Sequence, residues 1–243
     1  DLPMPRQVFA HGWLNLGGKK MSKTMGNVVD PVELVDKYGL DAVRYFALRE
    51  VPFGSDGDYT EEALVARINS DLANDLGNLV YRTLTMVRRF GGGLVPEVGR
   101  EDELDRRFRE DCLAMKAGVE SEMDRLHLSL ALEQIMSLVK KANKYIDEAS
   151  PWDLAKRADD RLGTVLSYLC ECLRMVALAL RPFMVKTPAK IWASLGMTET
   201  IDAATWDSAG RWGAVAPGQV TQRGKPMFPR IEDDKPDAIA GET

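Results

Sequence analysis

Cysteine and histidine are scarce in this 243-residue sequence, which has three cysteines and two histidines. The cysteines are Cys112, Cys170 and Cys172, a set that does not resemble a disulfide framework. Cys170 and Cys172 lie two apart in a helical stretch, so they point to different faces and are poorly placed to chelate together. We therefore expect reduced thiols in a cytoplasmic protein, and no metal site within this segment.

The sequence also lacks long apolar runs and an excess of positive charge. No run of 18 or more apolar residues is present, which argues against a membrane-spanning segment. The formal net charge is −5, so a general basic field that would attract nucleic acid is absent. Any contact with RNA must come from local basic patches. No internal repeat or low-complexity block is present.

The first part of the chain has mixed secondary-structure signals. Residues 7–10 and 13–16 read as two short strands. A helix is then predicted from Pro31, with Asp30 as its cap and Gly39 at its end. A second short helix follows over residues 41–49, and a turn-rich connector runs to residue 58.

From Thr60 onward the pattern is helical, with Thr60 as a cap and an apolar stripe running to the glycines at 91–93. Further amphipathic segments are predicted at about 101–124, 128–148, 160–180 and 184–195. After Gly196 we expect a tail that wraps over the surface or is partly disordered. The predicted fold class is mainly α. A small α/β remnant (1–58) precedes an antiparallel helix bundle (59–196) and the surface tail (197–243).

Two lysines and two hydroxyls gather in the segment Lys20-Met21-Ser22-Lys23-Thr24, after the pair Gly17-Gly18. Lys20 and Lys23 can stabilise negative charge on a triphosphate, and glycines allow backbone amides to approach phosphate oxygens. Ser22 and Thr24 can donate hydrogen bonds to the same oxygens. The alternative is a solvated hairpin tip, and these residues alone do not decide between the two.

A local basic strip lies between residues 76 and 90 and contains Arg82, Arg88 and Arg89. Asn78 is four residues before Arg82, so the two share a helix face that suits the base edges of exposed nucleotides. Trp152 follows Pro151 at a helix end, where an indole can stack on an unpaired base. The alternatives are a solvated helix face and a core tryptophan that caps the bundle.

The remaining polar candidates are weaker. Arg181, Lys186 and Lys190 lie in a segment without acidic residues, which could hold phosphates or simply form a helix exterior. His127 is expected to be structural. His11 lies nine residues before Lys20, on a strand that should flank any nucleotide site.

These signals coincide in one known pattern. His11-Gly12-Trp13, Lys20-Met21-Ser22-Lys23-Thr24 and Gly26-Asn27-Val28-Val29-Asp30-Pro31 resemble the Lys-Met-Ser-Lys-Ser region of class I aminoacyl-tRNA synthetases. Further segments resemble the methionyl-tRNA synthetase family in particular: Tyr38–Phe46, Phe53–Asp58, Asn74–Arg82, Tyr145–Trp152 and Phe228–Ile231.

The resemblance implies a role for each candidate. The family's loop stabilises ATP, bound with Mg²⁺ as substrate, while methionyl-adenylate forms, which assigns catalytic roles to Lys20 and Lys23. Thr24 replaces the usual serine but keeps the hydroxyl. The implied ATP-binding set is Lys20, Met21, Ser22, Lys23, Thr24 and His11. The implied anticodon-binding set is Asn78, Arg82 and Trp152, with Asn143 and Asp147 in support.

The resemblance also implies a missing part. Class I synthetases carry a His-x-Gly-His motif upstream, which a chain with histidines only at positions 11 and 127 does not contain. We therefore expect the C-terminal half of a methionine–tRNA ligase that begins inside a larger protein. The expected partners are the N-terminal half, which supplies the methionine pocket, together with tRNA(Met) and initiator tRNA. The segment alone should form no adenylate.

Two other functions compete with this interpretation. One is a stand-alone tRNA-binding module without a catalytic role. The other is a class I synthetase for leucine, isoleucine, valine or cysteine, which would share the lysine loop and a helix bundle. Such an enzyme would not share the set of Asn78, Arg82 and Trp152.

Overall fold

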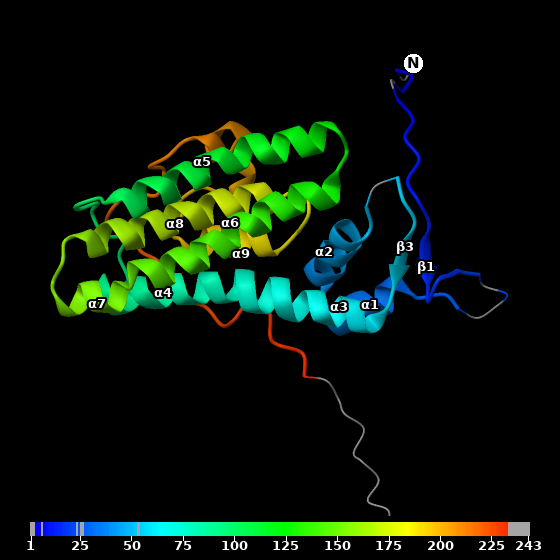
Figure 1. The fold of residues 1–243 in the computed structure, drawn as a ribbon, viewed down its shortest axis with the longest axis horizontal. Helices are drawn as coiled ribbons and strands as arrows, with labels where there is room; N and C mark the ends of the chain where they lie inside the picture. Colours follow the sequence, from blue (N-terminus) through cyan, green and yellow to red (C-terminus); the bar gives the residue numbers. More distant parts are fainter. Residues whose placement is uncertain (1–2, 6, 23, 25–26, 53, 233–243) are drawn as a thin grey trace, which may run out of the picture.

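A small sheet lies at one end of the molecule and a long bundle of helices forms the rest (Figure 1). This computed structural model describes residues 3–5, 7–22, 24, 27–52 and 54–232. Among these residues the architecture is mainly helical with one three-stranded sheet, which confirms the predicted fold class.

The sheet contains β1 (Leu14–Leu16), β2 (Lys19–Lys20) and β3 (Gly57–Tyr59), in the order β2-β1-β3. β1 pairs with β2 antiparallel and with β3 parallel. The second predicted strand is thus confirmed in part by β1. The first, at residues 7–10, is wrong, because none of the described strands lies beside it to share backbone hydrogen bonds.

Two short helices, α1 (Pro31–Tyr38) and α2 (Leu40–Glu50), connect β2 to β3. The Asp30 carboxylate accepts a hydrogen bond of 2.8 Å from the Val32 amide, and Gly39 has the positive φ that ends α1. The predicted start and end of this helix are both confirmed.

A continuous helical run follows, made of α3 (Glu61–Arg67), a π-helix η2 (Ile68–Gly77) and α4 (Asn78–Phe90). At 1.5 Å per residue the run is roughly 45 Å long. The Thr60 hydroxyl caps it as predicted, accepting from the Ala63 amide at 3.1 Å. The apolar stripe had predicted an uninterrupted α-helix, so the wider central turns are a difference from expectation.

Two contacts account for the wider turns of η2. The Asn143 side-chain amide donates to the Asp75 carbonyl at 3.0 Å, which draws this oxygen toward another helix. At the end of η2, a Cβ atom on Gly77 would lie 2.9 Å from the Leu72 carbonyl oxygen, five residues back. Only glycine fits this position without movement, because Cβ–oxygen contacts that close are repulsive.

We expect Gly77→Ala to destabilise the protein by about 1–2 kcal/mol, because the added methyl group overpacks the π-turn against the Leu72 carbonyl. Urea denaturation followed by circular dichroism measures this change. The matched control is Gly224→Ala, where an added Cβ meets no atom within 4 Å. Stabilisation by about 1 kcal/mol at Gly77, the usual gain from alanine in a helix, would contradict this account of η2.

The rest of the bundle contains five helices: α5 (Glu103–Asp124), α6 (Leu128–Ala149), α7 (Pro151–Lys156), α8 (Arg161–Leu180) and α9 (Thr187–Ser194). Four of them match the predicted amphipathic segments. The short helix α7 was not predicted. It starts directly after α6 because Ser150 adopts a left-handed conformation (φ 47°, ψ 60°) that turns the chain.

Helix α8 is the centre of the core. It is the one helix, within the described part of the chain, that is long and apolar enough to cross a membrane, and 89% of its apolar window is buried inside the fold. All three cysteines are free and buried, and burial together with Cys172 raises the pKa of the Cys112 thiol.

Buried ion pairs fix α8 to its surroundings. Arg161 donates to both carboxylate oxygens of Asp105 at 2.8 Å, and Tyr145 donates to the same carboxylate at 2.6 Å. Further along, Glu171 pairs with Arg174, which also donates to backbone carbonyls of the segment that follows α9. This segment includes two 3₁₀ turns, η3 (Ile201–Ala203) and η4 (Trp206–Gly210), and packs on the bundle through Ile231. Residues 233–243 of the predicted tail lie outside the described residues.

Candidate active-site loop and anticodon face

The tight turn between β1 and β2 presents the lysine loop, defined here as Lys20–Thr24. Gly17 and Gly18 both have positive φ (57° and 72°), the geometry of a two-residue hairpin turn. The turn is held from β3, because the Gly18 amide donates to the Asp58 carboxylate at 2.9 Å. The Asp56 carboxylate accepts from the Trp13 amide at 2.7 Å in the same way.

Asn27, three residues after the lysine loop, holds its first residues through side-chain hydrogen bonds. Its side-chain oxygen accepts from the Ser22 amide at 2.8 Å, and its side-chain nitrogen donates to the Lys20 carbonyl at 3.2 Å. The Ser22 and Thr24 hydroxyls lie 2.8 Å apart. The structure thus brings the two predicted hydroxyls together. Asn27, by contrast, carried no role in the sequence analysis, since only its place in the motif drew attention to it.

Of the two lysines in the loop, Lys20 lies among the described residues. The Lys20 ammonium lies 4.1 Å from the centre of the Trp13 ring, a cation–π contact at the surface. Met21 is half-buried and packs against the core. Lys23 lies outside the described residues, so its predicted role has no geometry to support it.

His11 does not share a cavity with the described residues of the lysine loop. It lines a cavity of about 190 Å³ with residues of α2 and with Leu128 at the start of α6. None of the described loop residues lines that cavity. The Nδ1 atom of His11 lies 2.7 Å from the Gly12 carbonyl oxygen.

The second set of candidates lies on α4 and α6. Asn78 is exposed in the first turn of α4, and Arg82 lies one turn later on the same face. Arg82 donates to the Asp147 carboxylate of α6 at 2.5 Å. Both side chains of this pair are solvent-accessible, so the pair orients the guanidinium without burying it.

Asn143 lies one turn before Asp147 on α6 and faces the helical run instead of solvent. Its amide nitrogen donates to the carbonyls of Asp75 and Val139, at 3.0 and 3.2 Å. Its side-chain oxygen is buried and, among the described residues, has no hydrogen-bond donor. The structure therefore shows Asn143 supporting η2.

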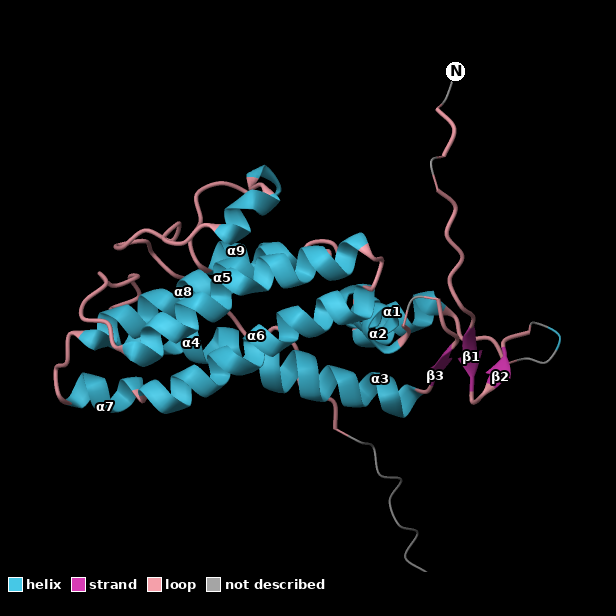
Figure 2. Cartoon of the chain, turned by 45° about the horizontal axis from the view of Figure 1, so that its top comes forward, coloured by secondary structure: helices cyan, strands magenta, loops and turns pink. Residues whose placement is uncertain are grey.

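Trp152 lies in the first turn of α7, directly after the buried residue Pro151. Its side chain is 38% exposed, so much of the indole is available at the surface. Helix α7 lies at the end of the bundle farthest from the sheet in both views (Figures 1 and 2). The loop and the Trp152 end are therefore separated by the length of the bundle.

The other basic candidates differ in their contacts, and the Arg89 guanidinium lies 5.3 Å from the centre of the Phe90 ring. Arg88 and Arg89 are exposed near the end of α4, and no ion pair to either occurs among the described residues. Arg181 is engaged: it donates to the Asp202 carboxylate at 3.1 Å and to the Ala204 carbonyl at 3.0 Å.

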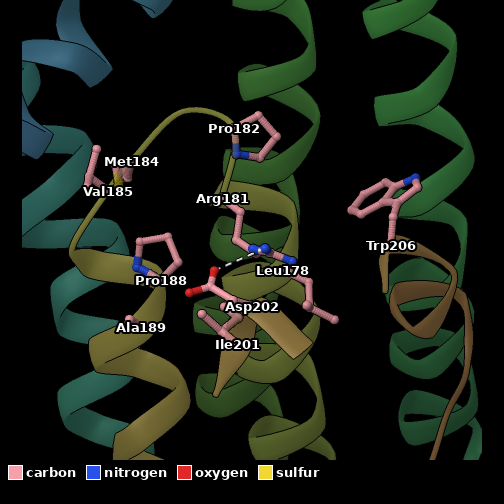
Figure 3. Close-up of a pocket in the computed structure, with 10 residues that line it drawn as sticks. All are labelled: Leu178, Arg181, Pro182, Met184, Val185, Pro188, Ala189, Ile201, Asp202 and Trp206. Carbon is pink, nitrogen blue, oxygen red and sulfur yellow. Dashed lines mark hydrogen bonds and ion pairs between the residues drawn. The ribbon is translucent and has the colours of Figure 1, made fainter. Parts of the chain in front are cut away.

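Arg181 and Asp202 line a surface groove of about 610 Å³ between α8, α9 and η3 (Figure 3). Most of its other lining residues are apolar, and none belongs to the predicted ATP or anticodon sets. The Nδ1 atom of His127, the histidine expected to be structural, lies 2.9 Å from the Glu122 carboxylate. Among the residues that the structure describes, no group of three His, Cys, Asp or Glu side chains is placed to hold a metal ion.

Comparison with known proteins separates the chain into two matched parts. Residues 1–84 match the family model described as class I tRNA synthetases (M). Residues 95–241 match the family model described as the anticodon-binding domain of methionyl-tRNA ligase. The chain belongs to the methionyl-tRNA ligase family. The predicted resemblance is confirmed.

Relatives in this family match over nearly the whole chain. The methionine–tRNA ligase of Caldanaerobacter subterraneus is 51% identical over 236 residues, which cover 96% of this chain and 36% of the relative. Methionine–tRNA ligase 1 of Bacillus anthracis is 48% identical, with the same coverage. The chain spans about a third of the length of the curated relatives it matches.

Solved structures of the family have the same fold. Mycobacterium tuberculosis methionyl-tRNA synthetase, solved with methionyl-adenylate, superposes with a TM-score of 0.86 at 39% identity. The match covers 94% of this chain and 45% of that one. The methionyl family assignment argues against the alternative of a synthetase for leucine, isoleucine, valine or cysteine.

Proposed function

We propose that this chain is the C-terminal portion of a methionine–tRNA ligase, and that it contributes the lysine loop of the ATP site and the surface that recognises the anticodon. One observation carries the proposal. The sheet that carries the start of the lysine loop and the helix α7 that carries Trp152 lie at opposite ends of the molecule (Figure 1). The loop, Asn78 and Arg82 fall within the part that matches the synthetase model, and Trp152 falls within the part that matches the anticodon-binding model. A tRNA molecule likewise presents its acceptor end and its anticodon at opposite ends.

In the proposed first step, the methionine carboxylate attacks the α-phosphorus of ATP and pyrophosphate leaves. Negative charge then builds on the departing phosphates, where the ammonium groups of Lys20 and Lys23 stabilise it together with Mg²⁺. Ser22 and Thr24 donate hydrogen bonds to the same oxygens, and Met21 and His11 complete the proposed ATP-binding set. The methionine pocket and the rest of the ATP site belong to the upstream half.

In the proposed recognition step, bases of the anticodon leave their stack and meet the far end of the bundle. Trp152 offers an exposed indole for stacking, and Asn78 and Arg82 offer amide and guanidinium groups to base edges. Asp147 orients Arg82, and Asn143 supports the helix that carries Asn78. The proposed RNA partners are tRNA(Met) and initiator tRNA.

An exposed apolar surface beside the sheet supports the proposed upstream partner. Val8 and Trp13 are 87% and 62% exposed, and Val28 and Val32 are exposed as well. Parallel strand pairs such as β1 and β3 are normally covered on both faces. We propose that the N-terminal half of the same cytoplasmic enzyme covers this surface. We also propose that this chain divides into the end of the catalytic domain (1–58), the anticodon-binding helix bundle (59–196) and a C-terminal tail (197–243).

The 243-residue chain alone tests this division of labour. We expect it to bind an RNA hairpin with the methionine anticodon at least tenfold more tightly than a hairpin with a scrambled anticodon, since stacking and base contacts contribute about 1–3 kcal/mol each. Fluorescence anisotropy measures both affinities.

The same preparation should show no methionine-dependent exchange of pyrophosphate into ATP. Equal affinity for the two hairpins would reject the proposed anticodon surface. Measurable exchange by the isolated chain would reject the proposal that the ATP site is divided between two halves.

A further inference from the structure

Two charged residues on one turn of α2 hold the connection between α8 and α9. Asp41 and Arg44 are three residues apart and lie on the same helix face. Helix α2 lies in the part that matches the synthetase model, whereas residues 182–187 lie in the part that matches the anticodon-binding model. The two side chains therefore join the two matched parts of the chain.

Asp41 caps the start of α9 from outside that helix. One carboxylate oxygen accepts from the Val185 amide at 2.8 Å, and the other accepts from the Lys186 amide at 3.0 Å. The second oxygen also accepts from the amide and the hydroxyl of Thr187, at 2.5 and 2.6 Å. The helix itself supplies no side-chain cap at this end. A residue of α2 thus accepts the backbone hydrogen bonds that are usually accepted by a capping residue next to the helix in sequence.

Arg44 engages the carbonyls that follow the end of α8. Its Nε atom donates to the Phe183 carbonyl at 2.9 Å, and one terminal nitrogen donates to the Pro182 carbonyl at 3.2 Å. The negative Asp41 carboxylate thus lies at the N-terminus of α9, where the helix dipole is positive. The positive Arg44 guanidinium contacts carbonyls just beyond the C-terminus of α8, where the dipole is negative. Both charges are of the sign that the helix dipoles favour.

The Asp41 side of this contact is buried. Asp41 is 6% exposed, and Phe183 and Met184 in the connection are buried in the same core as Tyr45 of α2. Burial alone would raise the pKa of Asp41, but hydrogen bonds from Thr187 and the backbone amides outweigh it and hold the pKa below its usual value. The carboxylate is therefore charged and fully engaged at neutral pH.

We propose that Asp41 and Arg44 are positioning residues that fix the angle between the lysine-loop part and the helix bundle, so that a tRNA held at the Trp152 end delivers its acceptor end to the reaction centre. The proposal rests on the function proposed above and extends it to residues that touch neither ATP nor RNA.

The length of the molecule makes this angle important. The helical run from α3 to α4 is roughly 45 Å long, so a rotation of about 5° at the joint displaces the far end by roughly 4 Å. A misplacement of about 1 Å in a reaction centre can cost a factor of about 100 in rate. Transfer to tRNA should therefore respond to the joint, while adenylate formation, which uses only one side of it, should not.

Asp41→Asn in the full-length ligase tests the proposal. The substitution keeps the side-chain shape but removes the negative charge. It also places a side-chain NH2 group where the backbone N–H groups need an acceptor. We expect kcat for charging tRNA to fall at least tenfold. Methionine-dependent pyrophosphate exchange and the Kd for tRNA should stay within twofold.

Thr187→Val is a milder variant that removes only the hydroxyl donor to Asp41, and it should lower kcat for charging two- to fivefold. The matched control is Glu50→Gln on the same helix. Glu50 pairs with Arg67 at 2.7 Å within the synthetase part and does not reach the α8–α9 connection. This control should leave all three measurements unchanged.

A distance measurement on the 243-residue chain tests the proposed joint independently of enzymatic activity. Spin labels on Glu33→Cys and Lys190→Cys, both at exposed positions, report the separation of α1 and α9, since the native cysteines are buried. We expect a narrow distance distribution in the parent chain and a broader or shifted one with Asp41→Asn.

An unchanged distribution, or equal losses of exchange and charging, would overturn the proposed joint. If the full-length parent showed no methionine-dependent exchange, the proposed function would fail, and the spin-label distances would still decide whether the joint exists.

Discussion

Lys23→Ala in the full-length enzyme should slow methionine-dependent pyrophosphate exchange by a factor of about 100–1,000. Removing one preorganised donor to the charge that develops in a transition state typically costs about 3–4 kcal/mol, which corresponds to this factor. The affinity for tRNA should remain within twofold, because the lysine loop and Trp152 lie at opposite ends of the bundle. Exchange kinetics at saturating methionine and ATP measure the effect.

The matched control is Lys19→Ala. Lys19 is exposed and immediately precedes Lys20 in β2, so the substitution removes one positive charge beside the loop without touching the residues assigned to ATP. Lys20→Ala is a less selective variant, because it also removes the cation–π contact with Trp13. If Lys19→Ala slowed exchange as much as Lys23→Ala, the effect would be general electrostatic attraction and the assigned role of Lys23 would be wrong.

Trp152→Ala should have the opposite profile. Loss of stacking on one base costs about 1–3 kcal/mol, so kcat/KM for charging should fall about 10–100-fold while exchange stays within twofold. The loss should come from stacking and not from unfolding, because Trp152 is 38% exposed and lies outside the buried core. Aminoacylation with limiting tRNA measures the charging rate, and thermal melting checks that the fold is retained.

Two further variants separate stacking from local structure. Trp152→Phe keeps an aromatic ring and should recover most of the charging activity. Lys156→Ala removes an exposed charge from the same short helix, α7, and should have little effect. A large loss of thermal stability in Trp152→Ala would instead support a structural role for this residue.

The sequence predicted the elements that are specified by neighbouring residues. The helix at 31–38 is an example, because Asp30, Pro31 and Gly39 fix its start and its end through local hydrogen bonds and backbone geometry. The lysine loop was identified for the same reason, since its chemistry lies in consecutive residues.

The features that were missed depend on residues far apart in the sequence. The π-helix η2 is held by Asn143, which is 68 positions from its partner Asp75, and an apolar stripe does not reveal that contact. The cap of α9 comes from Asp41, 146 positions before Thr187. The predicted strand at 7–10 was wrong for the converse reason: its composition suits a strand, but strand formation needs a partner that the described chain does not supply.

The central claim is that one chain carries half of an ATP site at one end and an anticodon surface at the other. The most direct test is the ratio of charging rate to pyrophosphate-exchange rate in full-length Trp152→Ala and Lys23→Ala, measured in one series with the parent enzyme. The ratio should fall at least tenfold in Trp152→Ala. In Lys23→Ala the exchange rate itself should fall by a factor of about 100–1,000, while the affinity for tRNA stays within twofold. Parallel losses of both activities in Trp152→Ala, with an unchanged ratio, would contradict the account.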